Sequence, residues 1–137
     1  MAELEVVQPP SWAKPKGYAN GVRSLGRGER ILFVGGQIGW DPVTCTFHSD
    51  DLGEQFAITL DNVLTVVREA GGKPESIARM TVYVTDLDAY RRSTRAIGQA
   101  WRARLGRHFP AMALIGVAGL LEPRAKVEIE ATCVLSE

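Results

Sequence analysis

The chain has 137 residues, 45% of them apolar and 23% charged, and its 16 basic and 16 acidic side chains cancel. This length suits one domain with a hydrophobic core, so we expect a single domain over residues 1–137. The balanced charge argues against a general nucleic-acid binder and against binding to anionic membranes, because both need a basic surplus. No apolar run in the sequence is long enough to span a membrane.

The start of the chain and its cysteines indicate a cellular compartment. The first ten residues are acidic and lack the basic-then-apolar pattern of a signal peptide. Cys45 and Cys133 show no metal-ligand spacing, so we expect no metal and a reduced, cytoplasmic protein. Cys133 falls on the apolar face of a predicted strand and is expected to be a small buried hydrophobe. A disulfide between Cys45 and Cys133 remains an alternative.

The N-terminal third predicts an arm followed by a hairpin. Residues 1–16 contain Pro9, Pro10 and Pro15, and we expect them to form an extended, loosely attached arm. Residues 18–25 and 30–38 predict two strands joined by a glycine-rich turn. The Gly35-Gly36 pair inside the second strand indicates a bulge, or a place where another backbone or a ligand comes close.

The middle of the chain predicts two helices with a strand between them. The first should begin at Asp50 or Asp51 and run to about residue 70, with a buried stripe at helical spacing. That stripe comprises Phe56, Leu60, Val63, Leu64 and Val67. Residues 77–85 are rich in β-branched side chains and predict the strand. The second helix should begin at Asp86 or Asp88 and end at Gly106.

The last third predicts two more strands, joined by a connection that turns at Glu122-Pro123. Residues 111–117 are almost wholly apolar, as expected of a strand covered on both faces. Residues 127–135 alternate, which places Glu128 and Glu130 together on the less apolar face. The two carboxylates are either a general acid/base with its support or a pair that is solvated or salt-bridged, and spacing alone favours the second.

The resulting order, β-β-α-β-α-β-β, indicates an α+β fold with two helices on one face of a mixed sheet. The other face must then be hidden by something else. Because residues 111–117 are apolar on both sides, we expect other subunits to cover it. An oligomer would place Glu128 and Glu130 near a subunit boundary.

Several short motifs follow one another in the order of a known family. They are Lys16-Gly17-Tyr18-Ala19, Leu32 to Ile38, Gln55 with Leu60 to Val63, Glu69 to Gly71, Thr81 to Asp86, Phe109 to Ala111, and Val127 to Ala131. Together they span nearly the whole chain after the first fifteen residues, and the chain resembles the Rid (YjgF-like) enamine/imine deaminase family. The resemblance implies a chorismate-mutase-like fold and a homotrimer with three clefts between subunits.

The resemblance also implies chemistry, and the chain departs from part of it. Such proteins hydrolyse reactive enamines and imines to keto acids and ammonia, without a cofactor. Their cleft tyrosine corresponds to Tyr18, and the carboxylate that positions water corresponds to Glu128. The arginine that grips the substrate carboxylate is replaced by Met112, and an asparagine often found on the second helix is replaced by Thr94. The usual Ser-Gly-Gln is Gly35-Gly36-Gln37, so a hydroxyl is missing.

The resemblance therefore predicts an inter-subunit cleft lined by Tyr18, Gly36, Thr94, Met112 and Glu128. Its function would be hydrolytic deamination of an imine or enamine, with Glu128 orienting water and Tyr18 contacting the substrate. Loss of the arginine predicts a substrate range shifted from simple 2-imino acids. One alternative is a non-catalytic protein that binds or senses a small molecule in the same cleft. A second, an RNA-acting protein, is disfavoured by the zero net charge.

Overall fold

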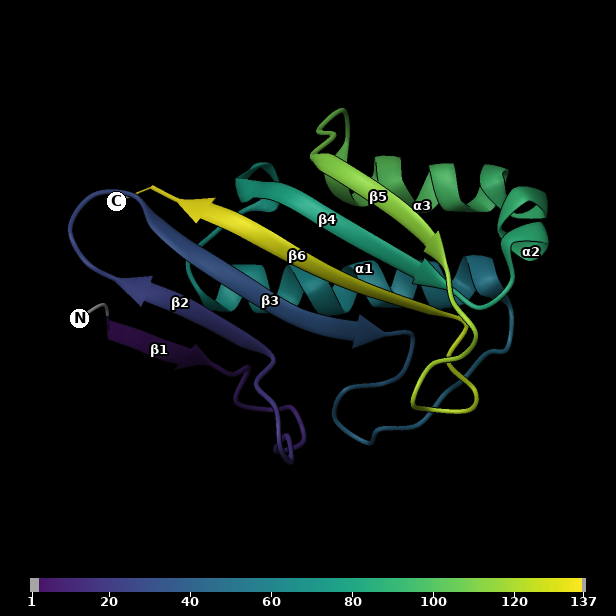
Figure 1. The fold of residues 1–137 in the computed structure, drawn as a ribbon, viewed down its shortest axis with the longest axis horizontal. Coiled ribbons are helices and arrows are strands. Elements are labelled where there is room, and N and C mark those ends of the chain that lie inside the picture. The colour runs from purple at the N-terminus through teal and green to yellow at the C-terminus, as the bar shows by residue number, and fades with distance from the viewer. Residues whose placement is uncertain (1–2, 137) are drawn as a thin grey trace.

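The last strand along the chain, β6 (Val127–Leu135), lies in the middle of a six-stranded sheet (Figure 1). The computed structural model describes residues 3–136. The other strands are β1 (Glu3–Val7), β2 (Gly21–Leu25), β3 (Arg30–Ile38), β4 (Ile77–Val84) and β5 (Ala111–Gly116). Their order across the sheet is β1-β2-β3-β6-β4-β5, and every neighbouring pair is antiparallel except the parallel pair β4–β5.

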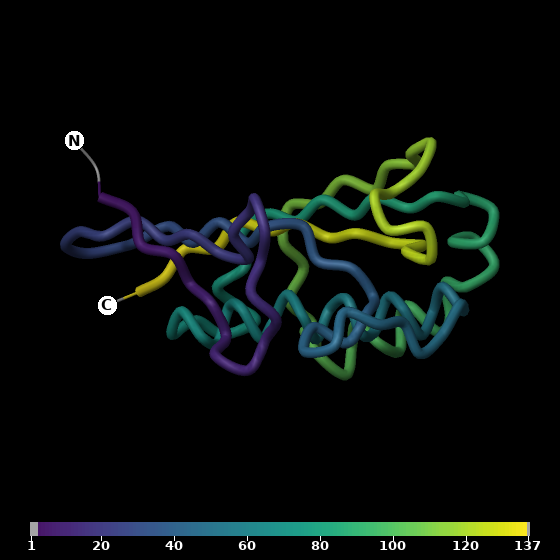
Figure 2. The backbone as a smooth tube through the Cα atoms, turned by 90° about the horizontal axis from the view of Figure 1, so that it is seen from below, coloured from purple at the N-terminus to yellow at the C-terminus, as the bar shows by residue number. Residues whose placement is uncertain are grey.

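All helices lie on one face of this sheet, as Figure 2 shows from the side. They are α1 (Leu52–Glu69), α2 (Leu87–Arg92) and α3 (Thr94–Leu105), with a 3-10 turn, η1 (Pro74–Ser76), before β4. The α+β class and the placement of the helices on one face of a mixed sheet are therefore confirmed.

Helix α1 begins where the sequence predicts, because the Asp51 side chain accepts a hydrogen bond from the backbone N–H of Glu54 at 3.0 Å. The predicted stripe from Phe56 to Val67 is buried against the sheet. Gly71, which adopts a φ of +87°, follows the end of the helix and lets the chain turn toward β4.

The predicted second helix is two helices. Asp86 caps α2, accepting from the backbone N–H of Ala89 at 3.0 Å, as expected. The helix is interrupted at Ser93, whose N–H bonds to the carbonyl of Tyr90, three residues back. The hydroxyl of Thr94 approaches the carbonyl of Arg91 at 3.4 Å. Serine and threonine are common where a helix is interrupted, because their hydroxyl groups can bond to nearby backbone groups.

The N-terminal arm contains a strand that the sequence analysis did not identify. β1 pairs with β2 along its whole length, so this part of the arm is attached to the sheet. Buried amides hold the following segment: Asn20 donates to Gln8 at 2.9 Å and accepts from Gln37 at 3.0 Å. Trp12 packs against the core from the same segment.

The two strands predicted for the last third of the chain are present as β5 and β6, but they are not neighbours in the sheet. β5 and β6 are separated by β4, and the chain turns between them with the N–H of Ala125 bonded to the carbonyl of Glu122 at 3.0 Å. β5 is an edge strand, exposed in the single chain except at half-buried Ala113. The apolar composition of β5 predicts that other residues cover both of its faces, and the residues of the same chain that the structure describes do not provide this cover.

The core lies between the helices and the sheet face that they cover. It includes the inward side chains of β6, among them Cys133, which is buried as predicted, while Cys45 is exposed. Neither cysteine forms a disulfide. No helix within residues 3–136 is long and apolar enough to cross a membrane.

Candidate functional site

The Glu128 side chain lies directly over Gly36 on the sheet face that the helices leave open. A Cβ atom built on Gly36 would lie 2.9 Å from Cδ and 3.0 Å from Oε2 of Glu128. Any side chain at position 36 would therefore displace the carboxylate. The structure thus brings together two of the predicted site residues.

The neighbouring glycine, Gly35, is in close contact with a different group, the backbone of Ala19. A Cβ atom on Gly35 would lie 2.5 Å from the carbonyl oxygen of Ala19, and the N–H of Gly35 donates to the carbonyl of Asn20 at 2.7 Å. The β3–β6 register shifts between Val34 and Gln37. The predicted bulge and the predicted close backbone contact are both confirmed. The crowding also means that a serine at position 35 would not fit without movement of the backbone at Ala19.

Glu128 is half-buried, and its surroundings disfavour the charged form. Burial and the nearby charge of Glu130 together raise the pKa of Glu128 above its ordinary value. Glu130 is exposed and accepts a hydrogen bond of 2.6 Å from the Tyr83 hydroxyl. That bond, with burial, raises the pKa of Tyr83.

Tyr83 is a site residue that the sequence analysis missed. In the antiparallel register of β4 and β6 it lies opposite Glu128, and its hydroxyl reaches diagonally to Glu130. The alternation of β4 places Tyr83 on one face, but sequence alone could not tell which strand would lie beside it. The strand partner was the missing information.

Tyr18 lies outside a strand, in a bend before β2, and is 56% exposed. Burial raises the pKa of Tyr18, and Cys45 and Glu122 raise it further. These neighbours come from the loops after β3 and before β6. Tyr18 therefore stands at the end of the sheet where these loops meet.

Met112 and Thr94 lie away from Glu128. In the parallel register, Met112 pairs with Met80, whose side chain is buried beneath the helices, whereas Glu128 pairs with Tyr83 on the opposite face. Met112 is 44% exposed at the sheet edge, and Thr94 is exposed at the start of α3. One chain thus places Glu128 with Gly36 on one face and Met112 on the other.

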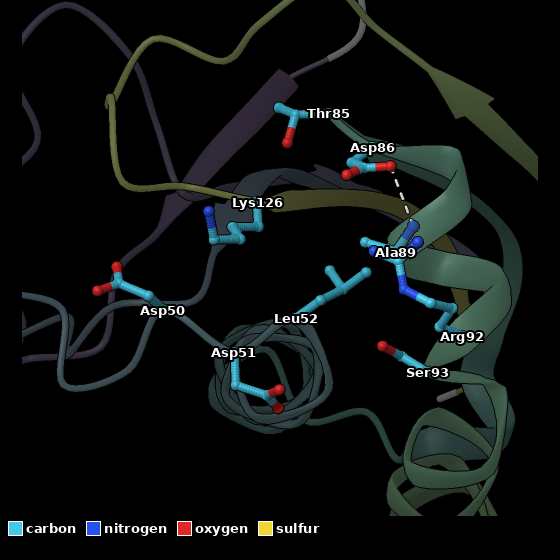
Figure 3. A pocket seen from close by; sticks show the side chains of 9 residues that line it. All are labelled: Asp50, Asp51, Leu52, Thr85, Asp86, Ala89, Arg92, Ser93 and Lys126. Atoms are coloured by element: carbon cyan, nitrogen blue, oxygen red, sulfur yellow. Dashed lines mark hydrogen bonds between the residues drawn. The ribbon is translucent and has the colours of Figure 1, made fainter.

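A cavity of ≈ 310 Å³ lies at the N-terminal ends of α1 and α2 (Figure 3). It is lined by Asp50, Asp51, Leu52, Thr85, Asp86, Ala89, Arg92, Ser93 and Lys126, none of them a predicted site residue. Its carboxylates already have partners, because Asp51 and Asp86 cap helices and Asp50 pairs with Arg124 at 3.0 Å. Glu128, with its perturbed pKa, is the better candidate for chemistry.

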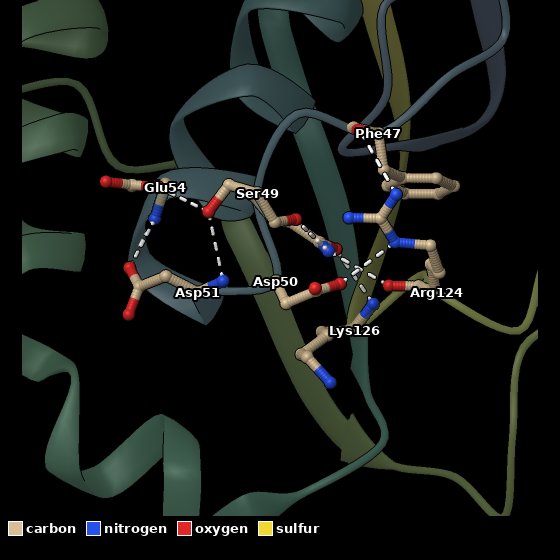
Figure 4. Close-up of polar contacts among 8 residues, drawn as sticks. Phe47, Ser49, Asp50, Asp51, Glu54, Arg124 and Lys126 are labelled. Atoms are coloured by element: carbon tan, nitrogen blue, oxygen red, sulfur yellow. Dashed lines mark hydrogen bonds and ion pairs between the residues drawn. The ribbon is translucent and has the colours of Figure 1, made fainter.

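Beside this cavity, a polar cluster joins the two loops that lead to α1 and β6 (Figure 4). The fully buried Gln55 donates to the carbonyls of Ser49 and Arg124, each at 2.9 Å, and accepts from the N–H of Lys126 at 2.9 Å. The Arg124 guanidinium lies 5.6 Å from the centre of the Phe47 ring. The start of β6, and with it Glu128, is held through these contacts.

The described residues hold no cluster of three or more histidine, cysteine, aspartate or glutamate side chains arranged to bind a metal. His108, for instance, contacts the backbone oxygen of Ile77 at 2.7 Å, which is a structural role.

Comparison with known proteins identifies the family. A profile of the family described as "Endoribonuclease L-PSP" matches residues 13–135. A RutC family protein of Aquifex aeolicus is 30% identical over 134 residues, covering 98% of this chain and 99% of that protein. A protein of Salmonella typhimurium named 2-iminobutanoate/2-iminopropanoate deaminase is 34% identical over 104 residues, covering 76% and 79%.

Comparison with solved structures supports the same family. A probable translation initiation inhibitor from Rhodopseudomonas palustris has a TM-score of 0.83 and 25% identity, covering 98% of this chain and 100% of that one. The structure of TdcF from E. coli with bound serine has a TM-score of 0.80 and 28% identity, covering 96% and 99%. The chain therefore belongs to the endoribonuclease L-PSP family, the YjgF/RutC/Rid family, and has its chorismate-mutase-like fold.

Proposed function

We propose that this protein hydrolyses a reactive imine or enamine to a carbonyl compound and ammonia. Relatives named as imine deaminases support this class of reaction. The observation that carries the proposal is the half-buried Glu128 carboxylate, which lies against Gly36 and has a raised pKa. A carboxylate whose pKa is shifted toward neutrality suits both the acceptance and the return of a proton.

In the proposed reaction, water attacks the imine carbon while Glu128 accepts one of its protons. The carbon–oxygen bond forms, and the imine nitrogen takes up a proton from the solvent to give a carbinolamine. Glu128 then returns its proton to the amino group, and the carbon–nitrogen bond breaks. Ammonia leaves, and the carbinolamine hydroxyl releases its proton to the solvent as the carbonyl forms. The sum is one imine and one water giving one carbonyl compound and one ammonia; an enamine first takes a proton on carbon to become the imine. No external oxidant, reductant or cofactor enters this balance.

The proposed cleft lies between subunits of a homotrimer. Two observations support an assembly: Ile31, Phe33 and Val134 expose apolar side chains on the sheet, and the edge strand β5 exposes Met112 and Ile115. Because Met112 and Glu128 face opposite sides of one sheet, the predicted cleft needs Met112 from a neighbouring chain. Tyr18 and Thr94 would complete its walls.

The proposed substrate is less anionic or more apolar than a simple 2-imino acid. A guanidinium binds a carboxylate through two parallel hydrogen bonds, whereas the thioether of Met112 offers a soft apolar surface. We expect slow turnover of imines from small amino acids and faster turnover where the side chain is bulky and apolar.

Ammonia release tests the proposal. Imines would be generated in situ by an amino-acid oxidase from a panel of amino acids that includes bulky apolar ones. We expect acceleration by the wild type and a loss of about 10²- to 10⁴-fold in Glu128→Gln. Glu75→Gln, which removes an exposed carboxylate from η1, is the control and should remain active.

A second candidate is a non-catalytic protein that binds a small molecule in the same cleft. It is favoured by Met112 and Gly35, which stand where the resemblance predicts an arginine and a serine. If no imine of the panel is consumed faster than its uncatalysed rate, and a ligand binds without being consumed, this candidate replaces the first.

A further inference from the structure

Four side chains form a square on the open face of the sheet, two on β4 and two on β6. In the register of these strands, Tyr83 lies opposite Glu128 and Thr81 lies opposite Glu130. The Tyr83 hydroxyl crosses the square diagonally and donates to Oε1 of Glu130 at 2.6 Å. A bond of this length to a carboxylate is typical of a charge-assisted hydrogen bond.

We propose that Tyr83 and Glu130 are the positioning pair of the Glu128 site, in which Tyr83 fixes the charged Glu130 beside Glu128 and so adds to the effect of burial on the pH range over which Glu128 accepts a proton. This inference rests on the proposed function. Neither residue is assigned a reacting role: Tyr83 holds Glu130, and Glu130 acts on Glu128 through its charge.

The negative charge of Glu130 is the main charge that acts on Glu128. β3 presents Gly36, which has no side chain, and β4 presents the phenol of Tyr83. On β6 itself, Glu130 is the charged neighbour, and it raises the pKa of Glu128 in the same direction as burial. Lys126, two residues before Glu128, acts on Asp50 instead.

The hydrogen bond keeps this charge at a fixed place. A glutamate on an exposed strand position samples several rotamers, and its average effect on a neighbour is weakened by solvent. The hydrogen bond from the Tyr83 hydroxyl holds the Glu130 carboxylate in one position on the sheet. The same pairing raises the pKa of Tyr83, chiefly through the hydrogen bond to Glu130, so Tyr83 stays protonated and remains a donor.

The sign of the expected change follows from like-charge repulsion. The negative charge of Glu130 disfavours ionisation of Glu128, so its removal lowers the pKa of Glu128. Glu130→Gln should therefore move the acidic limb of the pH–rate profile to lower pH. The same variant removes the acceptor of the Tyr83 hydroxyl, so the pKa of Tyr83 should fall as well.

The experiment combines titration with kinetics on the intact protein. The carboxyl carbons of glutamate and the ring carbons of tyrosine are followed by ¹³C NMR as the pH is raised, in wild type, Glu130→Gln, Tyr83→Phe and the control Glu75→Gln. Assignment of the Glu128 signal uses Glu128→Gln. We expect Glu130→Gln to lower the pKa values of both Glu128 and Tyr83, and Glu75→Gln to leave these pKa values unchanged.

Ammonia release is measured on the same proteins. We expect Tyr83→Phe to lower kcat about two- to tenfold with KM little changed, the effect of one lost hydrogen bond. If Glu128 titrates in Glu130→Gln as it does in the wild type, the proposal is overturned, whatever the rates. If the wild type releases no ammonia, the proposed function fails, and the two titrations still decide whether the pair controls Glu128.

Discussion

A side chain at Gly36 and the carboxylate of Glu128 would occupy the same space, since the Cβ position of one lies 2.9 Å from Cδ of the other. The bulge in β3 and the absence of a side chain at position 36 together make room for Glu128 on the sheet. The location of the candidate site therefore depends as much on a residue without a side chain as on the glutamate.

Gly36→Ala tests this relationship. We expect the added methyl group to displace the carboxylate and to lower ammonia release, with little change in stability, because only the end of the flexible Glu128 side chain has to move. Thermal unfolding and initial rates measure the two effects. Gly26→Ala is the matched control, because a Cβ atom there meets no heavy atom within 4 Å. A Gly36→Ala protein as active as the wild type would show that Glu128 tolerates displacement.

The raised pKa of Glu128 predicts how stability depends on pH. The folded chain holds the proton of Glu128 more tightly than the unfolded chain, whose pKa is near 4.5. Stability is therefore lost as the pH rises from the unfolded pKa through the raised folded pKa. Glu128→Gln removes this loss, so the variant should be more stable than the wild type at about pH 7 and nearly equal to it at about pH 4.

Urea unfolding at the two pH values checks this prediction, with Glu75→Gln as the control for the loss of one negative charge. If Glu128→Gln were more stable than the wild type by the same amount at both pH values, the cause would be packing and not ionisation.

Met112→Arg tests the substrate range. An arginine that reaches the carboxylate of a 2-imino acid should add about 1.5–3 kcal/mol of binding, or roughly ten- to more than a hundredfold in kcat/KM for small 2-imino acids. Met112→Leu keeps the apolar surface and should change little. Brisk turnover of small 2-imino acids by the wild type would contradict the significance given to Met112.

Gln55 is predicted to be important for stability and not only for the site. Gln55→Leu would leave two carbonyls and one N–H of the adjoining loops without their present partner. We expect a loss of about 3 kcal/mol or more, at 1–3 kcal/mol for each unsatisfied group. Chemical denaturation measures the loss. Gln99→Leu, at an exposed position on α3, is the control and should be nearly neutral. A small effect of Gln55→Leu would mean that water replaces the amide.

The features that sequence predicted well are those decided by local chemistry. The apolar stripe of α1, the alternation of β6 and the paired glycines at Gly35-Gly36 each carry their signal within a few residues. Strand β1 was missed, since five residues ahead of three prolines carry little pattern of their own. The break at Ser93 was missed because the apolar spacing continues across it.

What could not be predicted depends on contacts between distant segments. Nothing in β5 or β6 indicates that β4 lies between them, because the choice of strand partner is made by the whole sheet. For the same reason Tyr83 could not be placed beside Glu128 and Glu130. The resemblance grouped Met112 with Glu128, and only the strand register showed that one chain turns them to opposite faces.

The central position of β6 has a consequence for how the chain folds. β3 and β4 each pair with β6 and not with one another, so no strand pairing joins the two halves of the sheet until residues 127–135 have been synthesised. Until then, each half presents an unpaired strand edge, which is a hazard for association with other chains. The strand that carries Glu128 is thus also the one that joins the halves, and a nascent chain becomes a folded sheet and acquires its candidate site in the same event.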